Sequence, residues 1–285
     1  MRITEKSVVE IPRSSSLYPK EWAEINDAPE TLYAVGNIRL LQERKLTIVG
    51  SRRTPVSALK LGAEIARSLS SALVLLTGSA DGGDTAVIEG GLEKGNIVCL
   101  LAGGFAHLPQ ASLSLLERVA EKGLLLSPHP YDTPVRTFSF EYRNKLLAAL
   151  GEGTFVLGAP KKSGALITAK YAEKLGKKLF AIPYAPNTSA GEGCNALIKK
   201  GAYLTENAGD ILSALGIEER NETPKIVLKP DEEKLLQVLK DKAEAHASEL
   251  SQATGIPVFK LRAILSALEV KGLVVALGGN RYSPV

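Results

Sequence analysis

Basic and glycine-rich residues follow the first strongly apolar run of the chain. Gly50, Ser51, Arg52 and Arg53 stand between the run at 46–49 and a segment with helical spacing. Glycine permits a tight turn, and a helix N-terminus offers free N–H groups to an anion. Arginine side chains fork onto phosphate oxygens. We therefore expect phosphate binding here, the alternative being a plain strand-to-helix turn with exposed arginines.

A second glycine-rich loop, Thr77–Asp84, follows the next apolar run and contains Gly78. Two such loops on one edge of a sheet favour a nest of backbone N–H groups around phosphate. Asp81 and Asp84 weigh against strong anion binding, and a glycine-relaxed turn is the alternative. Gly104, after the third run, is a weaker case of the same pattern.

Aromatic and basic residues stand together at the expected start of a later helix. They are Phe140, Arg143, Asn144 and Lys145. Cations beside an aromatic ring suit a single strand, whose phosphates and bases both need partners. A solvated helix start with aromatic core residues is equally compatible with this pattern.

Two further loop-to-helix segments carry hydrogen-bond donors. Ser163, Gly164 and Thr168 follow two lysines, 161–162, after the fifth apolar run. Asn195 follows the sixth run, where it either caps a helix or contacts a ligand. We count all of these residues as candidate phosphate- or DNA-binding positions.

Signals for catalysis are few. His107, His129 and His246 have no metal-ligand spacing, and GxSxG, Walker A and GxGxxG strings are absent. Cys99 and Cys194 form no CxxC pair. We therefore expect no catalytic residues, no metal and no cofactor, and a binding protein rather than an enzyme.

Composition is compatible with a phosphate ligand. The chain has 285 residues, 45% hydrophobic and 23% charged, with a net charge of +4, and a pI near 8.9. This length suits a large domain plus a small one. No apolar run is long enough to cross a membrane, and residues 1–6 lack a signal-peptide pattern. We expect a cytoplasmic location and no membrane partner.

Apolar runs alternate with helical patterns through most of the chain, which predicts βαβ units around a parallel sheet. The predicted strands lie at 46–49, 73–76, 97–101, 124–126, 154–157 and 178–182. The predicted helices lie at 55–70, 84–94, 111–121, 140–150 and 165–175. The fold class is α/β, a Rossmann-like parallel sheet with helices on both faces. Ligands bind such sheets at the carboxyl ends of the strands.

The chain divides into four predicted parts. Residues 1–40 form an arm, with short helices at most, packed on the main domain 41–216. A polar linker, 217–229, leads to a winged helix at 230–285, with three helices followed by a hairpin.

The winged helix carries Lys260, Arg262, Lys271 and Arg281 on its third helix and wing. From Pro224 onward the net charge is only +2. That charge is weak for a reader of duplex DNA, and it favours a protein-docking or dimer-packing module.

In order along the chain, these motifs resemble those of the DNA-processing protein A (DprA/Smf) family. The shared motifs are Tyr18-Pro19 with Pro29–Asn37, Gly50-Ser51-Arg52, Phe140 with Arg143-Asn144-Lys145, Ser163–Ala169 and Gly193–Ala202. The resemblance covers about residues 17–215, and many members also carry a C-terminal winged helix.

The resemblance implies a bacterial cytoplasmic protein without catalysis. Such proteins bind single-stranded DNA, usually as homodimers through the Rossmann-like domain, and load RecA recombinase in natural transformation. Arg52, Arg143 and Lys145 would then line a basic pocket and grip phosphates, while Phe140 stacks on a base or supports the pocket.

The loop Thr77–Ile88 departs from the family pattern. Asp81 stands where a basic residue is common, Gly83 where isoleucine is common and Ile88 where histidine is common. An acid at this loop puts its phosphate contact in question. Two alternatives therefore stay open: a nucleotide-binding sensor or phosphoribohydrolase-like enzyme using the same crevice, and an adaptor dominated by the winged helix.

Overall fold

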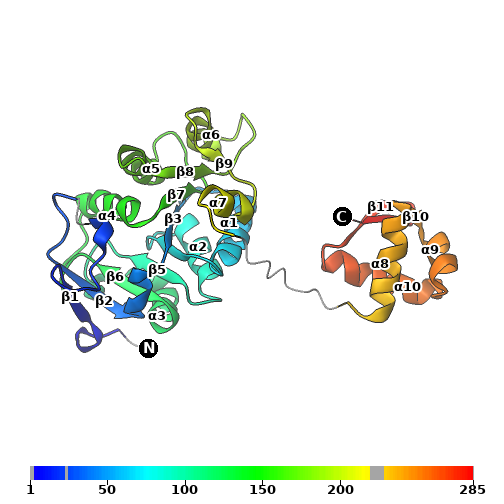
Figure 1. The fold of residues 1–285 in the computed structure, drawn as a ribbon, viewed down its shortest axis with the longest axis horizontal. Coiled ribbons are helices and arrows are strands. Elements are labelled where there is room, and N and C mark those ends of the chain that lie inside the picture. Colours follow the sequence, from blue (N-terminus) through cyan, green and yellow to red (C-terminus); the bar gives the residue numbers. More distant parts are fainter. Residues whose placement is uncertain (1–2, 23–24, 219–227, 285) are drawn as a thin grey trace. The chain divides into compact units, whose positions relative to one another are not determined.

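The computed structural model describes residues 3–22, 25–218 and 228–284. The chain divides into two compact units, Met1–Arg220 and Asn221–Val285. Most of the expected linker, 219–227, lies outside the described residues. Figure 1 shows the elements of each unit.

A nine-stranded sheet organises the first unit, in the order β1-β2-β6-β5-β4-β3-β7-β8-β9. Its strands are β1 (Val9–Pro12), β2 (Thr31–Gly36), β3 (Lys45–Val49), β4 (Val74–Thr77), β5 (Ile97–Leu100), β6 (Leu124–Ser127), β7 (Gly153–Val156), β8 (Lys178–Ala181) and β9 (Tyr203–Leu204). Strands β3 to β9 pair in parallel with one another, while β6 pairs antiparallel with β2 on its other side. The predicted α/β fold with a parallel sheet is therefore confirmed for the strands between β3 and β8.

Helices connect the parallel strands, and one more follows β9. They are α1 (Val56–Leu69), α2 (Gly83–Gly91), α3 (Leu113–Lys122), α4 (Thr137–Leu150), α5 (Gly164–Lys174), α6 (Glu192–Lys199) and α7 (Ala208–Ala214). Short 3-10 turns are η1 (Glu5–Ser7), η2 (Lys20–Trp22), η3 (Ile38–Gln42), η4 (Phe105–His107), η5 (Gln110–Ser112) and η6 (Ser189–Gly191). Helix α4 begins three residues before its predicted start, so Phe140 lies in its first turn.

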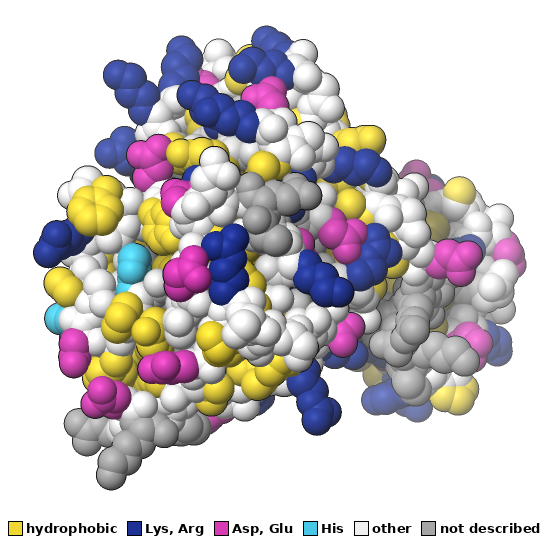
Figure 2. All heavy atoms as spheres, turned by 60° about the vertical axis from the view of Figure 1, so that its left-hand side comes forward, with side chains coloured by type: hydrophobic (Ala, Val, Ile, Leu, Met, Phe, Trp, Pro, Cys, Tyr) yellow, Lys and Arg dark blue, Asp and Glu magenta, His cyan; other side chains and the backbone are white. Residues whose placement is uncertain are grey.

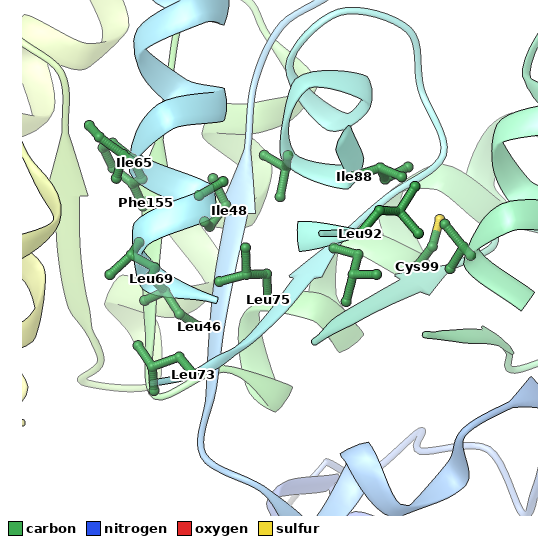
Figure 3. Close-up of a cluster of buried hydrophobic side chains, with 14 of the residues drawn as sticks. Leu46, Ile48, Ile65, Leu69, Leu73, Leu75, Ile88, Leu92, Cys99 and Phe155 are labelled. Carbon is green, nitrogen blue, oxygen red and sulfur yellow. The ribbon is translucent and has the colours of Figure 1, made fainter. Parts of the chain in front are cut away.

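Both faces of the sheet are covered, because successive residues of a strand point to opposite sides. On one face, Leu75 and Cys99 pack in one cluster with residues of α1 and α2 (Figure 3). Residues of α3 and α7 belong to the same cluster. On the other face, Leu76 and Leu100 pack with Trp22 and with α4. Helices α5 and α6 cover the end of the sheet next to β7 and β8. Strands buried on both sides explain the continuous apolar runs in the sequence.

The expectation of short helices at most in residues 1–40 was wrong. Strands β1 and β2 form an antiparallel hairpin, and β2 pairs antiparallel with β6. Trp22 is fully buried, and its indole N–H donates to the Leu146 carbonyl at 2.9 Å. Ser14, Ser15 and Ser16 lie between the two strands, Pro12 ends β1, and the segment extends the main sheet.

The second unit contains three helices and a small sheet. Its elements are α8 (Pro230–Lys242), β10 (Ala245–His246), α9 (Ala247–Thr254), α10 (Val258–Val270), β11 (Val274–Gly278) and β12 (Arg281–Pro284). The sheet order is β10-β12-β11, all antiparallel. Leucines at 235, 239, 250, 261, 265 and 268 form its core. This is the arrangement of a winged helix, as predicted.

Candidate nucleic-acid interface

The order in which strands are added to the sheet reverses at β3. This strand pairs with β4 on one side and with β7 on the other, and the chain proceeds outward from it in both directions. Loops leaving β3 and β7 therefore diverge, and a crevice opens at their carboxyl ends.

A hollow of about 450 Å³ occupies this place, and we name it the switch-point pocket. Its lining residues are Val49, Gly50, Ser51, Arg52, Arg53, Ala80, Asp84, Phe140, Arg143, Asn144, Leu147, Pro160, Lys162, Ser163, Gly164, Ala165 and Thr168. Ten of the fourteen predicted site residues line it. The other four, Gly78, Gly104, Lys145 and Asn195, do not.

Glycines bring the two loops of the pocket wall into backbone contact. A β-carbon on Gly83 would collide with the backbone of Gly50, and one on Gly82 would lie 2.9 Å from the Cα of Arg52. Gly82 also has a φ of +86°, which favours glycine. A side chain at position 83 would not fit unless the two loops moved apart.

Two arginines project from the first loop. The side chains of Arg52 and Arg53 are exposed, and within the described part of the chain neither guanidinium has a hydrogen-bond or ion-pair partner. The Ser51 hydroxyl, in contrast, already accepts a hydrogen bond from the Arg53 backbone N–H at 3.1 Å. Both arginines are therefore free to bind an anion at the pocket.

Arg143 lies in the pocket floor and is only 5% exposed. Its Nη1 donates to the Leu100 carbonyl and its Nε donates to Asn144 Oδ1, each at 3.0 Å. A β-carbon on Gly78 would collide with both the Arg143 guanidinium and the Asp84 carboxylate. Gly78 is thus required by this buried pair, and Arg143 is engaged by protein atoms.

Asp84 supplies the counter-charge to Arg143. The carboxyl is 4% exposed and accepts the Ala80 N–H at 3.1 Å. Burial raises the pKa of Asp84 above its ordinary value, while the charge of Arg143 and the Ala80 hydrogen bond oppose that rise. The floor therefore carries little net charge, and the positive charge of the pocket comes from its rim.

The start of α5 closes the pocket on the β7 side. Ser163 caps this helix by accepting the Ala165 N–H at 3.3 Å, and Asn144 donates to the Gly164 carbonyl at 3.3 Å. The Thr168 hydroxyl is fully buried, lines the pocket and has no hydrogen-bond partner among the described residues. Such a hydroxyl leaves a hydrogen bond to be made by a water, an ion or a ligand.

The placement of Lys145 in the pocket was wrong. Its ammonium group forms an ion pair with Asp27. Residues two apart on a helix lie about 200° apart around its axis, so Arg143 and Lys145 cannot face the same way.

Asn195 and Gly104 also have other roles. The Asn195 amide accepts from the Tyr184 N–H at 3.0 Å and donates to the Tyr184 carbonyl at 2.9 Å, so it neither caps a helix nor faces the pocket. Gly104 lines a separate hollow of about 90 Å³, and a β-carbon there would collide with the Tyr131 carbonyl.

Asp81, whose acidity raised doubt about the loop, is exposed and lines no part of the switch-point pocket. Two charged residues of the pocket, Lys162 and Asp84, were not among the predicted site residues. Lys162 was noticed only as local charge, and Asp84 was counted against anion binding. A buried acid paired with a buried arginine has no signature in sequence spacing.

Three of the four cations expected on the third helix and wing are engaged within their own unit. Lys271 pairs with Glu232 at 2.6 Å, Arg281 pairs with Glu244, and Arg262 donates to Asn280 at 3.3 Å. Phe259, on α10, is 76% exposed. This surface is thus less suited to a DNA backbone than the rim of the switch-point pocket.

Over the residues that the structure describes, no group of three or more His, Cys, Asp or Glu side chains could hold a metal ion. Within the same residues, no helix is long and apolar enough to cross a membrane.

Comparison with known proteins identifies both units. Residues 10–216 match the family described as DNA recombination-mediator protein A, and residues 218–280 match the DprA winged helix domain. DNA processing protein DprA of Bacillus subtilis is 34% identical over 219 residues, which cover 74% of this chain and 72% of the relative. DprA of Streptococcus pneumoniae is 34% identical over 199 residues, covering 69% and 70% of the two chains.

Solved structures agree. DprA of S. pneumoniae superposes with a TM-score of 0.69 at 31% identity, covering 73% of this chain and 74% of that one. DprA of Helicobacter pylori, a protein with a described single-stranded DNA binding mode, has a TM-score of 0.67 at 29% identity, covering 73% and 95%. The chain belongs to the DNA recombination-mediator protein A (DprA/Smf) family.

Proposed function

We propose that the switch-point pocket binds single-stranded DNA. The observation that carries this proposal is the rim: Arg52, Arg53 and Lys162 are exposed cations around a floor where Asp84 and Arg143 balance each other. Cations on a rim attract a phosphodiester backbone without reading sequence. The single-stranded DNA binding of the H. pylori relative supports the same ligand.

Phe140 suits an unpaired base. Its side chain is 39% exposed and lines the pocket beside Arg52. Aromatic rings next to cations stack on bases that are free of a duplex. A single strand offers such bases, whereas a duplex does not, and this favours the single strand as ligand.

We further propose that the chain mediates recombination without catalysis, by loading RecA recombinase on the bound strand in the bacterial cytoplasm, as a homodimer through the Rossmann-like unit. The family description as a recombination mediator supports this role. Light scattering of the purified chain tests the dimer. Stimulation of RecA ATPase activity on coated single strands tests the loading, and no stimulation would contradict it.

Binding is tested by fluorescence anisotropy with labelled oligo-dT over a salt series. The three rim cations alone contribute about −2 to the slope of log affinity against log salt, at roughly 0.7 per neutralised phosphate of a single strand. Duplex DNA and AMP are expected to compete poorly. A salt-independent affinity would overturn the proposal, and tight AMP binding with release of adenine would favour a nucleotide-processing enzyme instead.

Replacing Lys145 with alanine is expected to leave both the affinity for oligo-dT and its salt slope unchanged. The lysine pairs with Asp27 away from the pocket, and such partly exposed pairs contribute about 0–1 kcal/mol to stability. Anisotropy and denaturant unfolding of the variant check this. A salt slope reduced by about 0.7, the value for one phosphate, would show that Lys145 contacts the DNA.

A further inference from the structure

A second hollow, of about 420 Å³, adjoins the switch-point pocket at the start of α5. The two hollows share Lys162, Ser163 and Gly164 in their linings. A ligand that leaves the switch-point pocket across these residues therefore enters the second hollow directly. We name this hollow the α5 shelf.

The α5 shelf is cationic. Lys161, Lys162 and Lys170 line it, and its lining contains no carboxylate. Within the described residues, Lys162 and Lys170 have no ion-pair partner, and Lys161 approaches Glu192 only at 3.8 Å while its side chain stays 81% exposed. Figure 2 shows dark blue side chains gathered over the part of the unit where Figure 1 places α5 and α6.

The residues between the two hollows lie beside two features that favour an anionic ligand. Helix α5 has eleven residues, and its N-terminus favours negative charge. Independently of that end, the fully buried Thr168 hydroxyl lines the switch-point pocket without a partner. An anionic chain crossing between the two hollows would meet the helix N-terminus, and its part inside the switch-point pocket would lie beside Thr168.

The shelf also has an apolar part. Leu166 and Ile167 are half-buried and lie between the lysines in its lining. Gly164 and Lys170, at its two ends, are six residues apart, about 9 Å along a helix. An apolar floor of this size, with lysines around it, fits one sugar and its neighbouring phosphate.

We propose that the α5 shelf carries the continuation of the strand held in the switch-point pocket, with Lys161 and Lys170 neutralising the next phosphates. This proposal rests on the proposed function and extends it from a pocket to a path. Without an aromatic side chain in its lining, the shelf holds backbone and sugar rather than stacked bases, so it adds affinity without base preference.

The test compares K161Q/K170Q with the unchanged chain, using dT4 and dT20 across a salt series. Both lysines lie outside the switch-point pocket lining, so that pocket keeps all its residues. For dT20 we expect affinity to fall about tenfold at low salt and the salt slope to lose about 1.4, at roughly 0.7 per phosphate. For dT4, held by the switch-point pocket, we expect no change.

The matched control is K20Q/K60Q, which removes the same charge from exposed positions that line neither hollow. An unchanged dT20 slope in K161Q/K170Q, or an equal loss in the control, would overturn the path alone. Failure of the unchanged chain to bind dT20 would overturn both the proposed function and the path, so the two failures are distinct.

Discussion

Replacing Arg143 with leucine is expected to lower the free energy of unfolding by about 3–5 kcal/mol at neutral pH, the range for leaving a buried charge without its counter-charge. The substitution leaves the Asp84 carboxylate buried without its counter-charge and removes the donors to Leu100 and Asn144. Urea unfolding monitored by circular dichroism measures the loss. A loss below about 1 kcal/mol, typical of exposed pairs, would show that the guanidinium is not committed to the floor.

The same variant has a predicted pH dependence. Burial raises the pKa of Asp84, and Arg143 opposes the rise. Without Arg143 the folded-state pKa lies still higher, so the folded chain binds a proton more readily than the unfolded chain. The free energy of unfolding of R143L should therefore increase as pH falls. The difference between this value and that of the unchanged chain should become smaller. The double variant D84N/R143L removes both charges and should recover part of the loss at neutral pH.

Replacing Arg52 and Arg53 together with alanine is expected to weaken binding of oligo-dT by about 100-fold at low salt. Each charge-assisted hydrogen bond contributes about 1.5–3 kcal/mol, and roughly 1.4 kcal/mol corresponds to a factor of ten. The salt slope should lose about 1.4, because two phosphates are no longer neutralised. Anisotropy titrations across the salt series measure both quantities.

Arg39 and Arg118 provide the matched control. Both are exposed, and neither lines the switch-point pocket or the α5 shelf. R39A/R118A removes the same net charge, so an equal loss of affinity would mean that overall charge, and not the rim, binds the strand. Folding of R52A/R53A should be unaffected, since neither guanidinium has a partner in the described structure.

Much of the fold could be predicted, because strands buried on both faces leave continuous apolar runs in the sequence. Strands β1 and β2 were missed for a physical reason. Their pairing depends on β6, about ninety residues away, as in the pair Val35–Leu125. Strands β9 and β10 have two residues each, too few for a period of two to show.

The candidate site could be predicted at the level of loops. Parallel strands deliver their carboxyl ends to one edge, so the motifs after β3 and β7 had to meet there. The fate of single side chains depends on packing: Arg143 is buried because Gly78 leaves room for it. Only the error at Lys145 was avoidable, since helical geometry separates it from Arg143.

The pairing of β2 with β6 also bears on the order in which the chain folds during synthesis. Residues 31–36 leave the ribosome long before Leu124–Ser127, and the Trp22 indole donates to a carbonyl 124 residues further along the chain. Contacts of such sequence separation close large loops, and they form late and slowly. The segment that carries Trp22 must therefore wait, with this side chain exposed, until α4 has emerged. During this delay the exposed apolar surface of the nascent chain can be bound by chaperones.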